Sequence, residues 1–189
     1  MRPRNVCWTA ANGMPLTMRL ARASDAPQVK VSLEKLSPEA RRNRFFSPMP
    51  GFSEALVRKL SDVDPAQEHA LLVMRRENDL DYPVAGGRFV LSRDEFSGEA
   101  TRCDFALVVG DLWQGQGIGK RIMQALIAEA VKRKLQQMSG HILSSNEPML
   151  NLARTMGFQI EPDVDEGIHI ATLPLTQPRR SRWKKLIAC

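Results

Sequence analysis

A glycine-rich loop followed at once by a long amphipathic helix is the feature that most constrains the fold of this chain. Three glycines, Gly115, Gly117 and Gly119, alternate with other residues at the start of the helical pattern. Apolar residues then recur at the spacing of one helix face, and they are Ile122, Met123, Leu126, Ile127, Ala130 and Val131. An apolar run over 103–109 precedes the loop and predicts a strand. The segment therefore predicts a strand, a loop and a helix that packs on a sheet.

This arrangement is typical of an anion site, because the unpaired N–H groups of a helix N-terminus and the helix dipole both favour negative charge. Glycines let the anion approach the backbone closely. Two nucleotide motifs are excluded. A Walker loop requires glycine at Gln114 and Ser or Thr at Arg121. The dinucleotide fingerprint, started at Gly115, requires glycine where Lys120 stands. A turn without a ligand is the remaining alternative.

Strand and helix patterns along the rest of the chain predict one α/β (α+β) domain. We expect a mixed, mostly antiparallel sheet of about six to seven strands flanked by helices. The domain is predicted to span 16–175, between an N-terminal arm, 1–15, and a basic C-terminal tail, 176–189. The pair Gly86-Gly87 predicts a bulge or a close backbone approach within a strand.

Charge and composition exclude several classes of protein. The net charge is +6, but five cations without an acid lie in 178–189, which leaves the body at +1. Nucleic-acid binding is therefore not expected of the domain, and we interpret the tail as a solvated end. No apolar run approaches the ~20 residues of a membrane helix, so we expect a cytoplasmic protein. The cysteines and histidines show neither pairing nor ligand spacing, so we predict no disulfide and no metal.

The loop Gln114-Gly115-Gln116-Gly117-Ile118-Gly119 matches the pattern Q/R-x-x-G-x-G/A. In this the chain resembles the GNAT superfamily of acetyl-CoA-dependent N-acetyltransferases, and 145–158 is similar to a second conserved region of that superfamily. Three further segments, 36–41, 45–46 and 104–106, resemble the acetyltransferase domain of bacterial protein-lysine acetyltransferases of the Pat type. The resemblance implies a GNAT-like fold, acetyl-CoA as cosubstrate and an amine acceptor.

The resemblance also implies roles for individual residues. Asp104 stands where the Pat type has a glutamate base, and a base is needed because a lysine amine, with a pKa of ~10.4, is almost wholly protonated at neutral pH. The alternative for Asp104 is a structural carboxylate in a salt bridge. A bulge near the strand's end would direct the N–H of Val108 or Val109 at the thioester oxygen. The residues expected to hold CoA are Gln114, Gly115, Gln116, Gly117, Ile118, Gly119 and Lys120 for the phosphates, and Asn146 for the pantetheine arm.

One departure from the superfamily concerns the general acid. Many members have a tyrosine where Ala153 stands, so water or the hydroxyl of Ser144 or Ser145 is left to protonate the thiolate. We expect a protein lysine as acceptor, with a small-molecule amine or a CoA-binding module without turnover as alternatives. An acidic loop predicts a groove for a cationic acceptor, with a solvated loop as an equal alternative, and its acids are Glu161, Asp163, Asp165 and Glu166.

Overall fold

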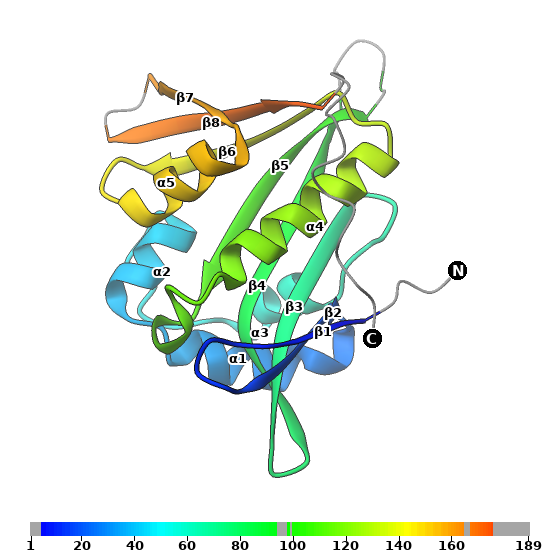
Figure 1. Ribbon diagram of the computed structural model, residues 1–189, viewed down its shortest axis with the longest axis vertical. Coiled ribbons are helices and arrows are strands. Elements are labelled where there is room, and N and C mark those ends of the chain that lie inside the picture. The colour runs from blue at the N-terminus through cyan, green and yellow to red at the C-terminus, as the bar shows by residue number, and fades with distance from the viewer. Residues whose placement is uncertain (1–4, 94–97, 99, 165–166, 176–189) are drawn as a thin grey trace.

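The computed structural model describes residues 5–93, 98, 100–164 and 167–175 (Figure 1). The tail 176–189, with Cys189, lies outside them. The strands are β1 (Val6–Thr9), β2 (Pro15–Leu20), β3 (Glu68–Glu77), β4 (Leu80–Arg93), β5 (Ala100–Val109), β6 (Gln137–Leu143), β7 (Gln159–Pro162) and β8 (Ile168–Pro174). The helices are η1 (Ala23–Asp25), α1 (Ala26–Glu34), α2 (Pro38–Phe45), α3 (Glu54–Ser61), η2 (Asp111–Trp113), α4 (Ile118–Lys132) and α5 (Glu147–Met156).

The strands form one mixed sheet in the order β1-β2-β3-β4-β5-β6-β8-β7. Every neighbouring pair is antiparallel except β5 and β6. The predicted fold class is confirmed, with eight strands in the sheet. The added strand is β1, which lies in the segment that we predicted as an arm and pairs with β2.

The parallel strands β5 and β6 pair over a short stretch only. Their register joins 102–104 of β5 to 137–139 of β6, and α4 connects the two strands. Beyond Asp104 no residue of β6 pairs with β5, and the two strands diverge in Figure 1. The second half of β5 therefore has a strand neighbour on the β4 side alone.

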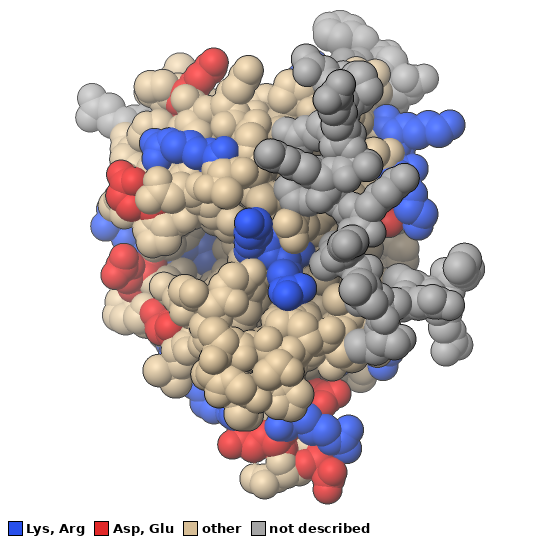
Figure 2. Space-filling view, in the orientation of Figure 1, with Lys and Arg blue, Asp and Glu red and all other residues tan. Residues whose placement is uncertain are grey.

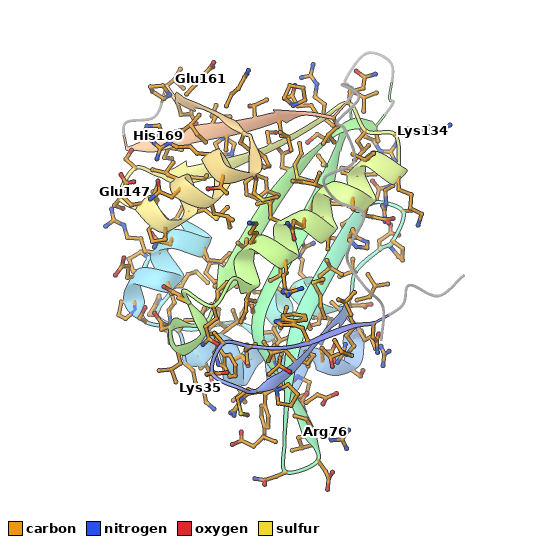
Figure 3. The ribbon with its side chains drawn as sticks, viewed as in Figure 1. Lys35, Arg76, Lys134, Glu147, Glu161 and His169 are labelled. Atoms are coloured by element: carbon orange, nitrogen blue, oxygen red, sulfur yellow. The ribbon has the colours of Figure 1, made fainter. Side chains whose placement is uncertain are left out.

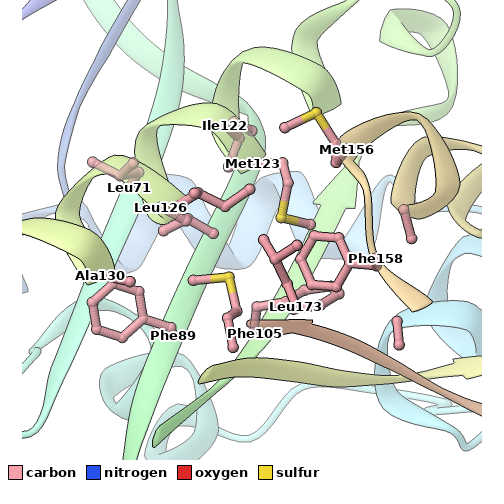
Figure 4. Packing of buried hydrophobic residues seen from close by; sticks show 14 of the residues in the cluster. Leu71, Phe89, Phe105, Ile122, Met123, Leu126, Ala130, Met156, Phe158 and Leu173 are labelled. Carbon is pink, nitrogen blue, oxygen red and sulfur yellow. The ribbon is translucent and has the colours of Figure 1, made fainter. Parts of the chain in front are cut away.

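Helices cover both faces of the sheet, each over its own apolar cluster. The helices α4 and α5 lie on one face, and α1, α2 and α3 lie on the other (Figure 1). Beneath α4, Ile122, Met123 and Leu126 are fully buried against β4 and β5. Phe105 meets Phe158 edge to face with 5.2 Å between ring centroids (Figure 4). Among the described residues, no helix has the length and apolar character needed to span a bilayer.

Of the two alternatives predicted at the paired glycines of β4, the close backbone approach is present there, and a bulge lies beside the glycines in the same strand. A Cβ placed on Gly87 would lie 2.3 Å from Cγ2 of Ile122, so the strand and α4 approach closely at this position. The register between β3 and β4 shifts at Val73/Met74, which leaves Val84 as the extra residue of a bulge. The glycine thus sets the depth at which α4 sits on the sheet.

Helix starts follow the capping residues in the sequence. Ser37 Oγ accepts the N–H of Ala40 at 3.1 Å at the start of α2, and Asn146 Oδ1 accepts the N–H of Met149 at 3.2 Å at the start of α5. The start of α1 is an exception. Ser24 lies inside the short helix η1, and Asp25 is the N-cap residue of α1 but makes no side-chain cap bond. Its carboxylate instead pairs with the guanidinium of Arg19.

Candidate active site

The N–H groups of residues 115–120 form an unpaired set at the start of α4. Gly115 and Gly117 have positive φ angles of 73° and 75°, and a Cβ on either would meet nothing within 4 Å. The first bond of the helix is from Arg121 N–H to the Gly117 carbonyl, at 3.2 Å. No hydrogen bond within the described part of the chain uses the N–H groups of 115–120. We call this segment the anion loop, because its exposed amides and the dipole of α4 suit a phosphate.

Gly119 serves packing rather than the turn. A Cβ there would lie 3.3 Å from Cδ2 of Leu152 and 3.4 Å from Cδ2 of Leu107, so the helix start is pressed against α5 and β5. Ile118 is buried and anchors the loop from within. Basic side chains gather over the first half of α4 (Figure 2). Lys120 is exposed there, and Arg121 lies over the ring of Trp8 at 5.0 Å.

Two glutamines hold the shape of the loop with their side chains. Gln114 donates from Nε2 to the carbonyl of Val109 at 3.3 Å, and Gln116 donates from Nε2 to the carbonyl of Leu112 at 3.1 Å. These amide groups bond backbone that would otherwise be unpaired. Both residues were predicted to contact CoA. In the structure their side chains bind the chain itself, and the N–H of Gln116 remains part of the anion loop.

Strand register separates the two predicted oxyanion donors. Gly110 N–H donates to the Val84 carbonyl at 2.9 Å. Bonded pairs alternate along an antiparallel ladder, so Val108 also bonds β4, whereas the N–H groups of Leu107 and Val109 point away from it. They open into the gap where β6 no longer pairs with β5. Val108 N–H is therefore not available to a thioester.

The bulge expected near the end of β5 is wrong. The register between β4 and β5 runs without a shift from Val109 back to Arg102, and its irregularity lies at Ser92/Arg93. Strand parity alone turns the N–H of Val109 toward the gap. Leu107 was missed by sequence reasoning, although it lies two residues before Val109 and its N–H therefore points to the same side of the strand.

Asp104 is held by hydroxyl groups rather than by a cation. Its carboxylate accepts hydrogen bonds from Ser92 Oγ and, at 2.6 Å, from Ser139 Oγ. Asp104 is exposed, and the described residues provide it with no salt bridge. At ~3.3 Å per residue, Asp104 lies about 10 Å along β5 from Leu107 and about 17 Å from Val109. A proton from an amine in the gap would reach it through water.

A cavity of about 450 Å³ lies between β3, β4 and β5 and the helices α1 and α2. Its middle is apolar, with Leu33, Leu36 and Leu72 in the wall. Ala106 and Val108 reach it from β5, the strand that also carries Leu107 and Val109. Charged side chains in its lining are Lys35, Arg44, Arg75, Arg88 and one acid, Asp111. Burial raises the pKa of Asp111, but hydrogen bonds from Ser37 outweigh it, so the pKa lies below its usual value.

The acidic loop does not line this cavity. Its described acids Glu161 and Asp163 belong to the far edge of the sheet, where Asp163 lies 3.6 Å from His141 Nε2. Glu161 and the cavity residue Lys35 lie at opposite ends of the molecule in Figure 3. Asp165 and Glu166 fall outside the described residues. The loop acids that the structure describes therefore do not contribute to this basic cavity.

Near the end of β6, a hydroxyl group lies within hydrogen-bond distance of a histidine ring. Ser144 Oγ lies 3.1 Å from Nδ1 of His169, in the strand beside it. Ala153, at the position of the superfamily tyrosine, is fully buried. Asn146 uses its side-chain oxygen as a helix cap, which leaves its NH₂ group as the available donor.

The remaining candidates for metal or thiol chemistry are few. In the described ranges no group of three or more His, Cys, Asp or Glu side chains could hold a metal ion. Cys7 and Cys103 are both free thiols, one exposed and one buried. Burial, with Asp104 adjoining, raises the pKa of Cys103 to about 12, so it is a poor nucleophile.

Comparisons with known proteins agree with this geometry. The model of the acetyltransferase (GNAT) family matches residues 36–158. An acetyltransferase of Pseudomonas aeruginosa is 26% identical over 84% of this chain and 83% of its own length. The acetyltransferase Pat of Mycolicibacterium smegmatis is 34% identical over 105 residues, which span 56% of this chain and 30% of that protein.

Solved structures share the fold. The GNAT domain of Pat from S. lividans superposes with a TM-score of 0.79 at 20% identity, over 90% of this chain and 97% of that one. A cAMP-binding acyltransferase from Mycobacterium smegmatis gives a TM-score of 0.59 at 23% identity, over 92% of this chain and 48% of that one.

Proposed function

Because this chain belongs to the acetyltransferase (GNAT) family, we propose that it transfers the acetyl group of acetyl-CoA to the amine of a protein lysine. The observation that carries this proposal is the presence of two sets of unpaired N–H groups, one on each side of the short segment that joins β5 to α4. The anion loop at the start of α4 presents one set, and Leu107 and Val109 present the other at the gap between β5 and β6. A molecule with phosphates at one end and a reactive carbonyl at the other fits this arrangement.

The anion loop holds the pyrophosphate of acetyl-CoA through its N–H groups, with Lys120 supplying a positive charge beside them. The pantetheine arm enters the gap between β5 and β6, where the NH₂ group of Asn146 is an available donor. The thioester oxygen accepts a hydrogen bond from the N–H of Leu107 or Val109. That bond stabilises the negative charge which develops on the oxygen during attack.

The acceptor amine approaches from the face that carries α1 and α2, through the cavity. Asp104 takes the proton of the amine through water, with Ser92 and Ser139 orienting its carboxylate. The neutral amine attacks the thioester carbon, and the C–N bond forms as the C–S bond breaks. The leaving thiolate is protonated by water or by Ser144, whose partner His169 can resupply the proton.

A protein lysine is proposed because segments around α2 and β5 resemble the Pat type. The relative that is 34% identical over 105 residues is also named Pat. A small-molecule amine is the second candidate. The observation that favours it is the cavity, because 450 Å³ is the size of a small-molecule site. The chain spans about a third of the Pat protein, so the substrates of that protein support this proposal only indirectly.

The proposal is tested by mass spectrometry with acetyl-CoA that carries a deuterated acetyl group. Purified protein is incubated with a cell extract, and deuterioacetyl groups are searched for on lysines and on small amines. We expect a limited set of labelled amines that is absent with the Gly117→Glu variant, which controls for spontaneous acetylation. Equal labelling by both proteins would contradict enzymatic transfer, and labelling of small amines alone would exclude the lysine acceptor.

A further inference from the structure

Arg44 is a cation in the cavity wall that has no anionic partner among the residues that the structure describes. It lies in the last turn of α2, partly buried, with its guanidinium 4.9 Å from the centre of the Phe45 ring. It makes neither a hydrogen bond nor an ion pair with any described residue. Burial lowers the pKa of Arg44 to about 10, and the charge of Arg88 contributes, yet the group remains protonated at neutral pH.

The two other arginines of the cavity lining each have an anionic partner within the chain. Arg88 forms an ion pair with Glu68 and donates to the carbonyl of Lys59 at 3.2 Å. Arg75 pairs with Glu77 at 2.5 Å. A cation that is shielded from water and has no partner lowers the stability of the fold. Proteins retain such a cation where a bound ligand supplies the missing anion. Lys35 also has no anionic partner among the described residues, but its side chain is exposed to water. Arg44 is therefore the partly buried cation of this wall that is prepared for an anion.

The position of Arg44 relates it to the proposed reaction. Its neighbour Arg88 pairs with Ala106 in the ladder of β4 and β5, and Ala106 precedes Leu107, one of the oxyanion donors. Apolar side chains, including Leu36 and Phe45, form the wall around it. A ligand that reaches from Leu107 to Arg44 needs an amine at the first end and an anionic group at the second. An apolar spacer between them would match the apolar wall.

Resting on the proposed function, we propose that Arg44 binds a carboxylate of the acceptor, so that the enzyme selects amines which carry a carboxylate beyond an apolar spacer. The carboxylate can belong to an amino acid or to an acidic side chain beside a lysine in a peptide. Arg suits this role because its planar fork donates two parallel hydrogen bonds to a carboxylate. We place this carboxylate on the acceptor rather than on the acyl group of the donor. The reason is that the cavity lies on the face of the sheet that carries α1 and α2, opposite α4.

The test compares acceptors that differ only in charge. The ratio of kcat/KM for 6-aminohexanoate to that for 6-aminohexanamide is measured for the unmodified protein, Arg44→Met and Arg44→Lys. Arg42→Met is the matched control, because Arg42 is exposed on the same helix. We expect a ratio of about ten or more in the unmodified protein and in Arg42→Met, since a charge-assisted hydrogen bond favours binding by about this factor. The ratio should fall to near one in Arg44→Met and be partly retained in Arg44→Lys.

Two further measurements separate the possible outcomes. Calorimetric binding of 6-acetamidohexanoate and its amide, in the presence of CoA, should give the same preference without any turnover. It therefore tests Arg44 even if no amine is acetylated, which would defeat the proposed function alone. Lysine peptides with a neighbouring Glu or Gln distinguish a peptide source of the carboxylate from a small amino acid.

Three results would overturn the inference. One is an equal affinity of the unmodified protein for the acid and the amide, and another is a preference that survives in Arg44→Met. The third is a preference for succinyl-CoA over butyryl-CoA that depends on Arg44, because it would place the anion on the donor. Arg44→Met should melt no lower than the unmodified protein, since it removes an unpaired charge, and this excludes misfolding as the cause of a lost preference.

Discussion

At the residue scale, Gly117 offers a clean test of the anion loop, because Gly13 provides a matched control. Both glycines have positive φ angles, 75° and 84°, and both face open space. Glutamate at either position meets the same backbone penalty of ~1–2 kcal/mol, but only Gly117→Glu places a negative charge among the amides of 115–120. We expect Gly117→Glu to weaken acetyl-CoA binding, measured by calorimetry, by at least about a hundredfold.

Gly13→Glu, in the turn between β1 and β2, should bind acetyl-CoA as the unmodified protein does. If the two variants lose affinity equally, backbone strain is the cause and the loop is not the phosphate site.

The role of Asp104 is also a residue-scale question, because the described hydrogen-bond partners of its carboxylate are two hydroxyl groups. Asp104→Asn cannot take up the proton of the amine, so kcat should fall ~10²- to 10⁴-fold. Asp104→Glu should stay active, since it keeps the carboxylate. Higher pH should partly rescue Asp104→Asn, because solvent then deprotonates the amine.

The control for this series is Asp163→Asn, a carboxylate at the other end of the sheet. A near-normal kcat for Asp104→Asn, with an unchanged pH profile, would move the base elsewhere. Unchanged acetyl-CoA affinity in the same variant checks that only the chemical step is affected.

The sequence predicted residues whose role depends on local chain geometry. The glycines of the anion loop are of this kind. It could not predict Arg44, because the exposure of this cation to a cavity depends on how α2 lies against β4 and β5. It left Val108 and Val109 as alternatives, and the ladder with β4 was needed to separate them.

At the element scale, the closeness of α4 to β4 predicts a specific sensitivity. A methyl group at Gly87 would overlap Cγ2 of Ile122, so Gly87→Ala should destabilise the fold by about 1–3 kcal/mol. Denaturant unfolding measures this change. Gly51→Ala, at a position with open space around it, should have little effect.

A double mutant tests the cause of that destabilisation. Ile122→Leu removes the Cγ2 methyl, so Gly87→Ala should cost less in the Ile122→Leu background than in the unmodified protein. Additive changes in the free energy of unfolding would show that the two positions do not collide.

Elements were predicted well where capping residues or glycines mark their ends. The strand predicted over 103–109 lies within β5, and the apolar face predicted from Ile122 to Val131 lies within α4. The strand β1 was missed because four residues before a turn give too little alternation to recognise. The bulge in β5 was expected from a family resemblance, and the ladder in this chain is regular there.

At the scale of the whole molecule, His69 is expected to make stability depend on pH. Burial lowers the pKa of His69, opposed by Glu129 and assisted by Arg133 and Lys132. Its contribution is complete above the unfolded pKa of about 6.5 and is lost as pH falls from there toward the lower folded pKa, because the unfolded chain takes up the proton first. His69→Phe keeps the stacking on Phe89 and should flatten the stability profile between pH 7 and 5.5.

Chemical denaturation at several pH values measures this profile. A slope that is the same for the unmodified protein and His69→Phe would assign the pH dependence to other groups.

The overall class of the fold could be predicted because the loop of 114–119 occurs in a defined strand, loop and helix context. The order of the strands could not. β8 pairs with β6 and places β7 at the edge, which results from contacts between segments far apart in the sequence. The gap beside β5 depends on the same long-range arrangement, because it opens where β6 turns away.

The central claim, that this fold binds acetyl-CoA at the anion loop and the β5–β6 gap, is tested most directly by thermal denaturation in the presence of acetyl-CoA, ATP or NAD. A ligand at a hundredfold excess over its Kd stabilises the native state by about 2.7 kcal/mol, a rise in Tm of about 5–10 °C for a domain of this size. We predict this rise with acetyl-CoA and a much smaller one with ATP or NAD. A Tm that is indifferent to millimolar acetyl-CoA but raised by ATP or NAD would contradict the account.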